Sequence, residues 1–337
     1  MRAVRYLGRS GGVVVERAHP EPVCGPGEAR VRPKRVGIAP ADLTTAQGLG
    51  TDEPITMGFE FVGVVEEVGN AESGDARTGE RARSLAGKRV VGSKTLACGR
   101  CDLCRRGLAI HCREQTVLGV RGRDGCFADA LVIPVRNLHE VPDSVDDDCA
   151  IFAEAVAAAV HAAHQIHLEG KTFVTVLGDG VVALLCAQVM QRMNASVRVI
   201  GESESRLGLC DKWGIKSRNI EEIGLRADQD AVIDCTGTPR GFERALQLIR
   251  PRGTVLVKKP FTKAQAHTRP LGTVAIVRDE IEVIGSRSGP LPEALDYLRT
   301  ERVDVVSLIT RRMKLDDGAK ALEIAAGADQ IKVLMDV

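Results

Sequence analysis

Aromatic residues are scarce in this sequence of 337 residues, which contains one Trp, two Tyr and seven Phe. Proteins that bind single-stranded nucleic acids stack bases on aromatic side chains, so this composition argues against such a surface. An excess of one charge is also lacking, because 46 Lys and Arg residues face 45 Asp and Glu residues, for a net charge of +1. A balanced charge draws neither nucleic acid nor an anionic membrane to a protein. We therefore expect a small-molecule substrate as the partner.

Long apolar runs are missing as well. The opening stretch MRAVRYLGRSGG lacks the apolar core of a signal peptide, and no run reaches the ~20 residues that span a bilayer. We expect a cytoplasmic protein without a membrane partner, whose cysteines stay reduced. Six cysteines are scattered singly among apolar neighbours, as buried thiols are: Cys24, Cys126, Cys149, Cys186, Cys210 and Cys235.

The remaining four cysteines are crowded into the stretch CGRCDLCRRGLAIHC, residues 98–112. The spacing C-x2-C-x2-C-x7-C lets four thiolates close tetrahedrally round one zinc ion. Four protein ligands leave no position for water or substrate, so the ion cannot act in catalysis. The sequence predicts one structural zinc, bound by Cys98, Cys101, Cys104 and Cys112.

The chain is longer than one hydrophobic core usually fills, so two domains are expected. In the first 140 or so residues, β-branched runs separated by Gly and Pro predict mostly antiparallel strands. These runs lie at residues 11–18, 28–38, 59–69, 87–93 and 127–134. From Lys171 onward, strands alternate with helical patterns, which predicts a Rossmann fold: a doubly wound parallel sheet with helices on both faces.

Three further segments carry predictions. Residues 70–87 are polar and glycine-punctuated, which predicts a surface loop, and residues 146–167 predict one helix with three acids at its start. Three histidines near the end of that helix predict exposed residues favoured by the helix dipole, with a metal site as the alternative: His161, His164 and His167. Two amphipathic helices and a strand that returns to the first domain are expected at residues 290–300, 317–327 and 331–337.

A phosphate-binding loop is predicted where Gly178, Gly180 and Ala183 form G-x-G-x-x-A between an apolar strand and a helix. The first glycine allows a tight turn, the second lets the backbone approach a pyrophosphate, and the alanine permits close packing of helix on strand. The helix N-terminus also favours an anion. This context predicts a bound NAD or NADP.

The choice between the two nucleotides depends on the end of the next strand, where a carboxylate usually binds the ribose hydroxyls. Gly201 stands there, and Ser203 and Arg206 could bind a 2′-phosphate, which favours NADP weakly. Glu202 could instead bind the hydroxyls of NAD. Two residues at the end of a later strand are expected near the nicotinamide, or alternatively to cap the next helix: Thr236 and Gly237.

The four-cysteine stretch, the loop VLGDGVVALLCAQV and the segment DCTGTPRGFERALQLIRPRGT together resemble the medium-chain, zinc-dependent alcohol dehydrogenase superfamily over essentially the whole chain. The resemblance implies an α/β protein with two domains. One is a GroES-like, β-rich catalytic domain at 1–153 and 287–337, with a structural-zinc lobe at about 95–115, and the other is a Rossmann NAD(P)-binding domain at 154–286. It also implies alcohol–carbonyl hydride transfer at a catalytic zinc, a homodimer or homotetramer, and a basic residue, Lys332, near the pyrophosphate.

The catalytic-zinc ligands of that family are a cysteine in G-x-C-G-[TS]-D, a histidine in G-H-E, and a Glu or Cys before the cofactor domain. This sequence has Ala39 and Phe59 at the first two positions and keeps only Glu154. Asp42 and Glu60 remain where the family has the acids that orient its ligands. A lone carboxylate holds zinc weakly, so we expect no catalytic zinc.

A pocket with Phe59 in its floor would raise the pKa of Glu154, Glu60 or Asp42, so that one of these carboxyl groups could serve as a general acid. Hydride transfer itself needs the nicotinamide and no metal. The sequence therefore predicts an NAD(P)-dependent oxidoreductase acting on a small carbonyl, alcohol or activated C=C substrate. The alternative is an NAD(P)-binding protein that does not catalyse and has a regulatory or structural role.

Overall fold

The computed structural model describes residues 1–69, 76–167, 172–261 and 272–337, and it divides into two compact units. The first unit is Met1–Glu154 with Leu308–Val337, and the second is Ala155–Ser307. The second boundary follows residue 307, whereas the sequence analysis placed it at 286. Helix α11 (Leu291–Arg299) therefore belongs to the second unit, where its apolar face is buried.

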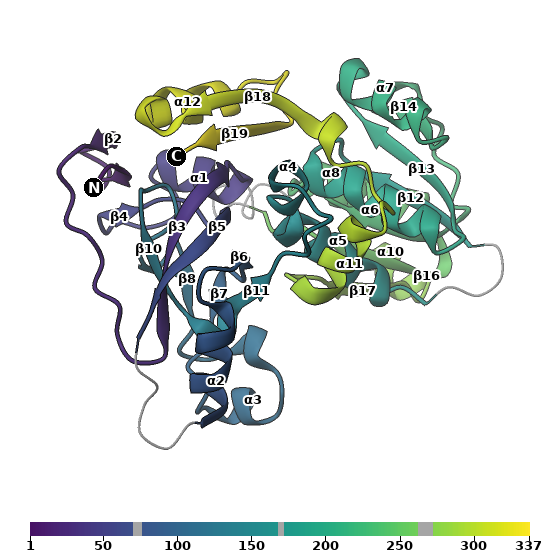
Figure 1. Cartoon of the computed structure of the whole chain (residues 1–337). Helices are drawn as coiled ribbons and strands as arrows, with labels where there is room; N and C mark the ends of the chain where they lie inside the picture. The colour runs from purple at the N-terminus through teal and green to yellow at the C-terminus, as the bar shows by residue number, and fades with distance from the viewer. Residues whose placement is uncertain (70–75, 168–171, 262–271) are drawn as a thin grey trace. The chain divides into compact units, whose positions relative to one another are not determined.

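The main sheet of the first unit has the order β11-β6-β5-β3-β19-β18, and β10 pairs with β3. Its strands are β3 (Glu28–Gly37), β5 (Glu60–Val68), β6 (Arg89–Gly92), β10 (Leu131–Pro134), β11 (Leu138–Glu140), β18 (Ile309–Lys314) and β19 (Lys332–Asp336). The pairing is antiparallel except between β18 and β19. The terminal strand does return to the first domain, because Leu334 of β19 pairs with Gly37 of β3 (Figure 1).

Alternation of apolar and polar residues explains this sheet. Along β3, Ala29, Val31 and Val36 are buried in the core of the unit, while Arg32 and Lys34 are exposed. Two smaller sheets complete the unit: β1 (Ala3–Tyr6), β2 (Val13–Glu16) and β4 (Ile55–Thr56) form one, and β7 (Thr95–Leu96), β8 (Thr116–Leu118) and β9 (Gly122–Arg123) form the other. The expectation of a mostly antiparallel β-domain is confirmed.

The surface loop expected at residues 70–87 is wrong for much of its length, because residues 76–85 form helix α2 (Ala76–Leu85). Residues 70–75 lie outside the described part of the chain. The helix contacts β5 and buries Ala82 and Leu85. Between residues 80 and 85, where the side chains of the helix are described, these two apolar residues stand among charged and polar neighbours, which is a weak periodic signal in the sequence.

The single helix expected at 146–167 is two helices, α4 (Asp147–Ala150) and α5 (Ala153–His164). Asp146 caps α4, because its side chain accepts a hydrogen bond from the backbone N–H of Cys149 at 2.7 Å. The break between the two helices contains Ile151 and Phe152, both completely buried. Anchoring these side chains in the core redirects the chain just before Glu154.

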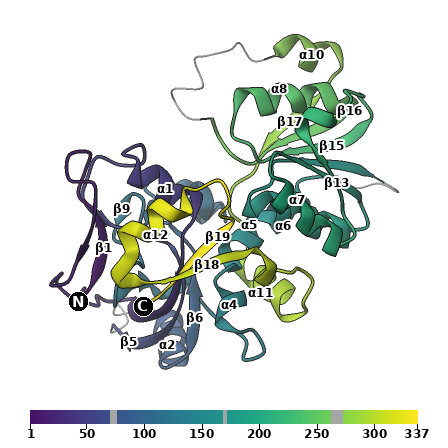
Figure 2. The same ribbon diagram turned by 90° about the horizontal axis from the view of Figure 1, so that it is seen from above.

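The second unit contains a parallel sheet of order β14-β13-β12-β15-β16-β17, which confirms the doubly wound Rossmann fold. Its strands are β12 (Phe173–Leu177), β13 (Ser196–Gly201), β14 (Lys216–Asn219), β15 (Gln229–Asp234), β16 (Ile249–Val257) and β17 (Glu282–Gly285). Helices α6 (Val181–Arg192) and α7 (Glu204–Lys212) cover one face, and α8 (Pro239–Leu248) covers the other (Figure 2). The phosphate-binding loop joins β12 to α6, at the carboxyl edge of the sheet.

Strands β14 and β18 and helix α10 (Thr273–Arg278) were not predicted from the sequence. The two strands are polar, with the sequences KSRN and ITRRMK, and lie at the edges of their sheets. Within the described residues, no helix has both the length and the apolar composition needed to cross a bilayer.

Candidate functional site

The four predicted zinc ligands lie together in a lobe made of β7, α3 (Asp102–Arg105) and a 3-10 turn at Ala109–His111 (Figure 1). Their sulfur atoms all lie within 4.8 Å of one another. The Sγ–Sγ distance is 4.0 Å between Cys98 and Cys104 and 3.9 Å between Cys101 and Cys112. Zn–S bonds of ~2.3 Å at tetrahedral angles place sulfur atoms ~3.8 Å apart, so the donors fit a zinc ion.

Backbone N–H groups support the same arrangement. The N–H of Cys98 points to Cys112 Sγ at 3.2 Å, and that of Cys101 points to Cys98 Sγ at 3.4 Å, which stabilises thiolates. Among the described residues, no other group of His, Cys, Asp or Glu side chains has metal-binding geometry. His164 instead pairs with Glu293 at 3.0 Å, and His161 contacts Gln165 at 3.1 Å.

The position of the family's catalytic zinc contains no such donor set. Ala39 begins helix α1 (Pro40–Ala46), Phe59 precedes β5, and both side chains are buried in the core of the first unit. Glu154 lies in the first turn of α5 and its carboxylate is also buried. A methyl group and a phenyl ring offer no lone pair, so one carboxylate is the only ligand left of the three.

Sequence reasoning missed Lys94, which lies in the bend between β6 and β7. Its Nζ is 3.3 Å from Glu154 Oε1 and 4.8 Å from the centre of the Phe59 ring. A lysine between a strand and the first cysteine of the lobe carries no sequence signal of its own. Only the fold brings it to a carboxylate 60 positions later in the chain.

Asp42 and Glu60 lie deeper in the same unit. The Asp42 carboxylate is completely buried and accepts a hydrogen bond from the Ala39 backbone N–H at 2.8 Å, which fixes the start of α1. Burial, helped by the nearby Glu60 carboxylate, raises the pKa of Asp42 to about 7, although the Ala39 N–H and the charge of Lys332 oppose the rise. This is the direction that the sequence predicts for an acid in an apolar pocket.

Glu60 forms a buried ion pair with Lys332, whose Nζ also donates to the Ile38 carbonyl at 3.2 Å. The Lys332 side chain is 2% exposed, and its ammonium group lies 5.5 Å from the Phe152 ring. The resemblance implied a basic residue near a pyrophosphate. In this structure the Lys332 charge is neutralised inside the first unit by a carboxylate, so its partner is Glu60.

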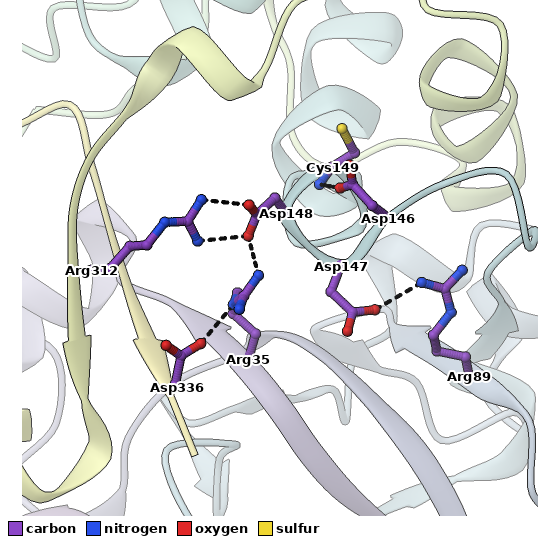
Figure 3. A network of polar contacts seen from close by, with 8 residues as sticks. All are labelled: Arg35, Arg89, Asp146, Asp147, Asp148, Cys149, Arg312 and Asp336. Carbon is purple, nitrogen blue, oxygen red and sulfur yellow. Dashed lines mark hydrogen bonds and ion pairs between the residues drawn. The ribbon is translucent and has the colours of Figure 1, made fainter.

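A second network holds the segment that leads to Glu154 (Figure 3). Asp148 pairs with both Arg35 of β3 and Arg312 of β18, and Arg35 continues to Asp336 at 2.8 Å. Asp147 pairs with Arg89 of β6 at 2.8 Å. The acids at the start of the predicted helix therefore tie α4 to the main sheet, rather than serving only the helix dipole.

The phosphate-binding loop has the predicted geometry. Gly178 has φ +104°, a conformation that favours glycine, and a Cβ at Gly180 would point into open space. Ala183 is buried in the first turn of α6, where a larger side chain would separate helix and strand. The open space beside Gly180 lies at the start of a 12-residue helix, whose N-terminus favours an anion.

Asp179, between the two glycines, reaches the end of β13. Its Oδ2 accepts hydrogen bonds from the backbone N–H groups of Glu202 and Ser203, both at 2.8 Å, and its Oδ1 is 3.1 Å from Arg206 Nη1. A Cβ on Gly201 would come within 2.6 Å of Asp179 Oδ2. The carboxylate of the loop thus occupies the space beside Gly201, and three of the predicted nucleotide-selecting residues face it.

At the end of β15, Thr236 donates from its hydroxyl to Asp234 Oδ1 at 2.6 Å. The cap of α8 is Thr238, which accepts from the Gly241 N–H at 3.0 Å, so Thr236 is not that cap. Gly237 has φ +66°. Both residues lie at the carboxyl edge of the sheet, where doubly wound folds bind ligands.

Comparison with known proteins agrees with this architecture. Residues 25–143 match the family model described as the alcohol dehydrogenase GroES-like domain. The chain is 30% identical over 338 residues to an L-threonine 3-dehydrogenase of Streptomyces avermitilis, covering 94% of each chain. It is 26% identical over 352 residues to a sorbitol dehydrogenase of Halalkalibacterium halodurans, covering 99% of each.

Among solved structures, the chain is similar to a protein of Sinorhizobium meliloti described as a zinc-binding dehydrogenase bound to NADP. The TM-score is 0.87 and the identity 26%, over 100% of this chain and 99% of the other. These relatives span both units of the chain and not only one of them. Together with the doubly wound sheet and the cysteine lobe, they show that the chain belongs to the medium-chain dehydrogenase/reductase superfamily, the alcohol dehydrogenase-like NAD(P)-dependent oxidoreductases.

Proposed function

We propose that this protein is an NAD(P)-dependent oxidoreductase that interconverts a small carbonyl compound and its alcohol, or reduces an activated C=C bond, without a catalytic zinc ion. One observation carries the proposal: the phosphate-binding loop is complete, while Ala39 and Phe59 stand where the family has two zinc ligands. The dinucleotide, when bound, supplies or accepts the hydride. The protein has to bind it, orient the substrate and exclude water.

One zinc ion per chain belongs to the same proposal. The cysteine lobe supplies four thiolates with the spacing of a closed tetrahedral site, and it would hold the ion permanently. Elemental analysis of the protein purified without added metal should therefore give about one zinc per chain. A second zinc would mean that Glu154 has partners for a catalytic ion and would overturn the metal-free mechanism.

Turnover is tested with NADH and NADPH against panels of aldehydes, ketones, enones and quinones. Gly180→Ala and Gly208→Ala form a matched pair, because an added Cβ meets no atom within 4 Å at either glycine. Only Gly180 lies in the loop, so we expect Gly180→Ala to weaken NAD(P)H binding by about tenfold or more and Gly208→Ala to leave it unchanged. Equal binding by both variants would contradict the assignment of the loop.

The non-catalytic alternative is favoured by the loss of two zinc ligands. It predicts tight NAD(P)H binding with no oxidation by any substrate class, even in single-turnover experiments with excess protein. Oxidation of bound NAD(P)H by any one class excludes it.

The nucleotide preference rests on Asp179. The sequence analysis favoured NADP weakly through Gly201, Ser203 and Arg206, but the Asp179 carboxylate already pairs with Arg206 and accepts from the Ser203 N–H. A 2′-phosphate at this turn would meet that negative charge, whereas ribose hydroxyls can donate to it. The arrangement favours NAD, and Glu202 need not supply the carboxylate.

Fluorescence titration tests this preference. We expect NADH to bind about tenfold more tightly than NADPH, and Asp179→Ser to shrink that ratio. Asp211→Ser, which removes an exposed acid from α7, is the control and should leave the ratio unchanged. Tighter binding of NADPH by the unmodified protein would restore the preference expected from the sequence.

A further inference from the structure

Lys94 lies against two of the three side chains at the position of the family's catalytic zinc. Its ammonium nitrogen is 3.3 Å from Glu154 Oε1, the retained carboxylate, and 4.8 Å from the ring centre of Phe59, which replaces the histidine. The electron-rich face of the ring attracts the ammonium charge. The retained carboxylate and the ring that replaces the histidine therefore hold an organic cation, where the family has a metal cation.

Burial shows why a cation is needed there. The Glu154 side chain is 6% exposed, and a buried carboxylate without a counter-charge is strongly destabilising. Lys94 is 29% exposed, so its charge is anchored beside the buried carboxylate but remains open to the solvent side. Within the described residues, Glu154 Oε1 has no hydrogen-bond partner, because the contact with Lys94 is an ion pair without hydrogen-bond alignment.

The Lys94 ammonium group and the Glu154 carboxylate can therefore each form a further hydrogen bond to a bound substrate. An ammonium ion carries three N–H donors, and the ion pair and the aromatic ring do not use all of them. A substrate oxygen that accepts one of these hydrogen bonds would lie beside the cation, as it would beside a metal ion. The unpartnered, buried Oε1 can at the same time accept from a hydroxyl of the substrate or from a water molecule.

We propose that the Lys94 ammonium group replaces the catalytic zinc as the electrophile of this enzyme, binding and polarising the substrate oxygen while Glu154 and Phe59 hold it in place. The proposal rests on the proposed function. In the reducing direction, the hydride forms the new C–H bond and the π pair of the C=O bond moves to the oxygen. The oxygen takes a proton from Lys94, and the neutral amine regains a proton from solvent.

The chemistry of the cation selects the substrate class. Zinc carries two charges and coordinates oxygen directly, whereas an ammonium ion carries one charge and only donates hydrogen bonds. It therefore stabilises an alkoxide less, which favours reduction of electron-poor aldehydes and ketones over oxidation of simple alcohols.

Four variants separate this role from a merely structural ion pair: Lys94→Met, Glu154→Gln, the double variant, and Lys88→Met as control. Lys88 also pairs with a glutamate, Glu140, at 2.9 Å, but both side chains are about half exposed. We expect Lys94→Met to lower kcat for an electron-poor aldehyde by about 100-fold, as loss of a donor to a developing oxyanion does. Lys88→Met should change it by less than about twofold.

The double variant decides the question. Removing both charges should restore the Tm lost in Lys94→Met, because no unpaired carboxylate stays buried, but it should not restore kcat. A purely structural pair predicts that kcat recovers together with the Tm, and that result would overturn the proposal.

A binding measurement keeps the proposal separate from the proposed function. Isobutyramide presents a carbonyl oxygen that is not reduced under these conditions, and calorimetry can follow its binding to the protein saturated with reduced dinucleotide. We expect binding about tenfold weaker for Lys94→Met than for the unmodified protein and for Lys88→Met. Equal binding by all three refutes Lys94 as the electrophile, whereas absence of turnover with retained, Lys94-dependent binding refutes only the proposed function.

Discussion

Two positions in the first unit correspond to zinc sites of the family, and they differ in how many ligands this chain retains. The cysteine lobe has all four thiolate ligands, whereas the catalytic position has one ligand of three. Between residues 97 and 113, all of which the structure describes, only Cys112 is buried. By contrast, Ala39 and Phe59 are packed among buried apolar side chains in the hydrophobic core of the first unit. A lobe with so few buried side chains has little else to hold it together, so we expect its folding to depend on the ion, whereas the packed region around Ala39 and Phe59 has apolar contacts of its own.

The largest expected effect comes from breaking the lobe. Cys104→Ser should reduce zinc from about one per chain to nearly none and lower the free energy of unfolding by more than about 4 kcal/mol. Cys24→Ser is the control, because Cys24 lies outside the cluster and its thiol donates to the backbone carbonyls of Gly25 and Glu28. Elemental analysis and urea denaturation measure both quantities, and a stable, zinc-free Cys104→Ser protein would show that the lobe folds without its ion.

Rebuilding the catalytic position sharpens the comparison. With Ala39→Cys and Phe59→His in place, the three family ligands are present, but the Lys94 ammonium group still lies beside Glu154. We expect this variant to keep about one zinc per chain and the additional substitution Lys94→Ala to raise the content to about two, because cation and metal compete for one carboxylate. Two zinc ions with Lys94 still present would show that the lysine does not occupy the position.

A smaller effect is expected from Asp42. Its pKa of about 7 exceeds the ordinary value of 3.8, so the folded protein binds this proton more tightly than the unfolded chain does. The resulting stability is fully present below pH 3.8 and is lost as the pH rises to about 7, by up to about 4 kcal/mol. Urea denaturation from pH 4 to 8 should show this decline, and Asp42→Asn should flatten it.

Asp52→Asn controls for loss of an acid, because Asp52 is exposed and pairs only with Arg9 in the described structure. It should leave the pH dependence unchanged. An Asp42→Asn variant with the same slope as the unmodified protein would show that another buried group binds the proton.

The smallest effect concerns the network of Figure 3. The guanidinium groups of Arg312 and Arg35 lower the pKa of Asp148 below 3.8, although burial opposes them. Its stabilising contribution is therefore present above pH 3.8 and is lost as the pH falls through the lowered pKa. Asp148→Asn should lower the free energy of unfolding by about 1–2 kcal/mol at pH 7 and by less in acid, whereas Asp102→Asn, whose pair with Arg113 is exposed, should leave it almost unchanged.

Much of the fold was predictable because its signals are local. Apolar strands such as β12 and β13 follow the hydrophobic pattern closely, and the glycines of the loop stand directly between strand and helix. Edge strands β14 and β18 carry mostly polar side chains, so their sequences lack the apolar pattern by which a strand is predicted. Helix α2 was missed for a similar reason, since Ala82 and Leu85 are the buried residues among 80–85, the part of the helix whose side chains are described.

The candidate site divides in the same way. The four cysteines share fifteen consecutive positions, so their spacing alone predicts a tetrahedral site. The replacement of two zinc ligands by Ala39 and Phe59 could also be predicted from the sequence, because each position lies within a short motif. Lys94 and Asp179 were not, since each acts on a partner that is brought to it only by the fold.

The amino-acid sequence alone indicates three features of the chemistry: a closed zinc lobe, a dinucleotide loop, and a catalytic position with one of its three metal ligands. These follow from residue type and short spacing, which covalent geometry enforces within a few residues. The contacts between distant polar groups follow only from the tertiary structure. They are the ion pairs Lys94–Glu154 and Lys332–Glu60 and the hydrogen bonds from the backbone at the end of β13 to Asp179. Such pairs form only because the path of the backbone brings distant positions together. Burial then strengthens the electrostatic interaction in each pair, because water no longer screens the charges.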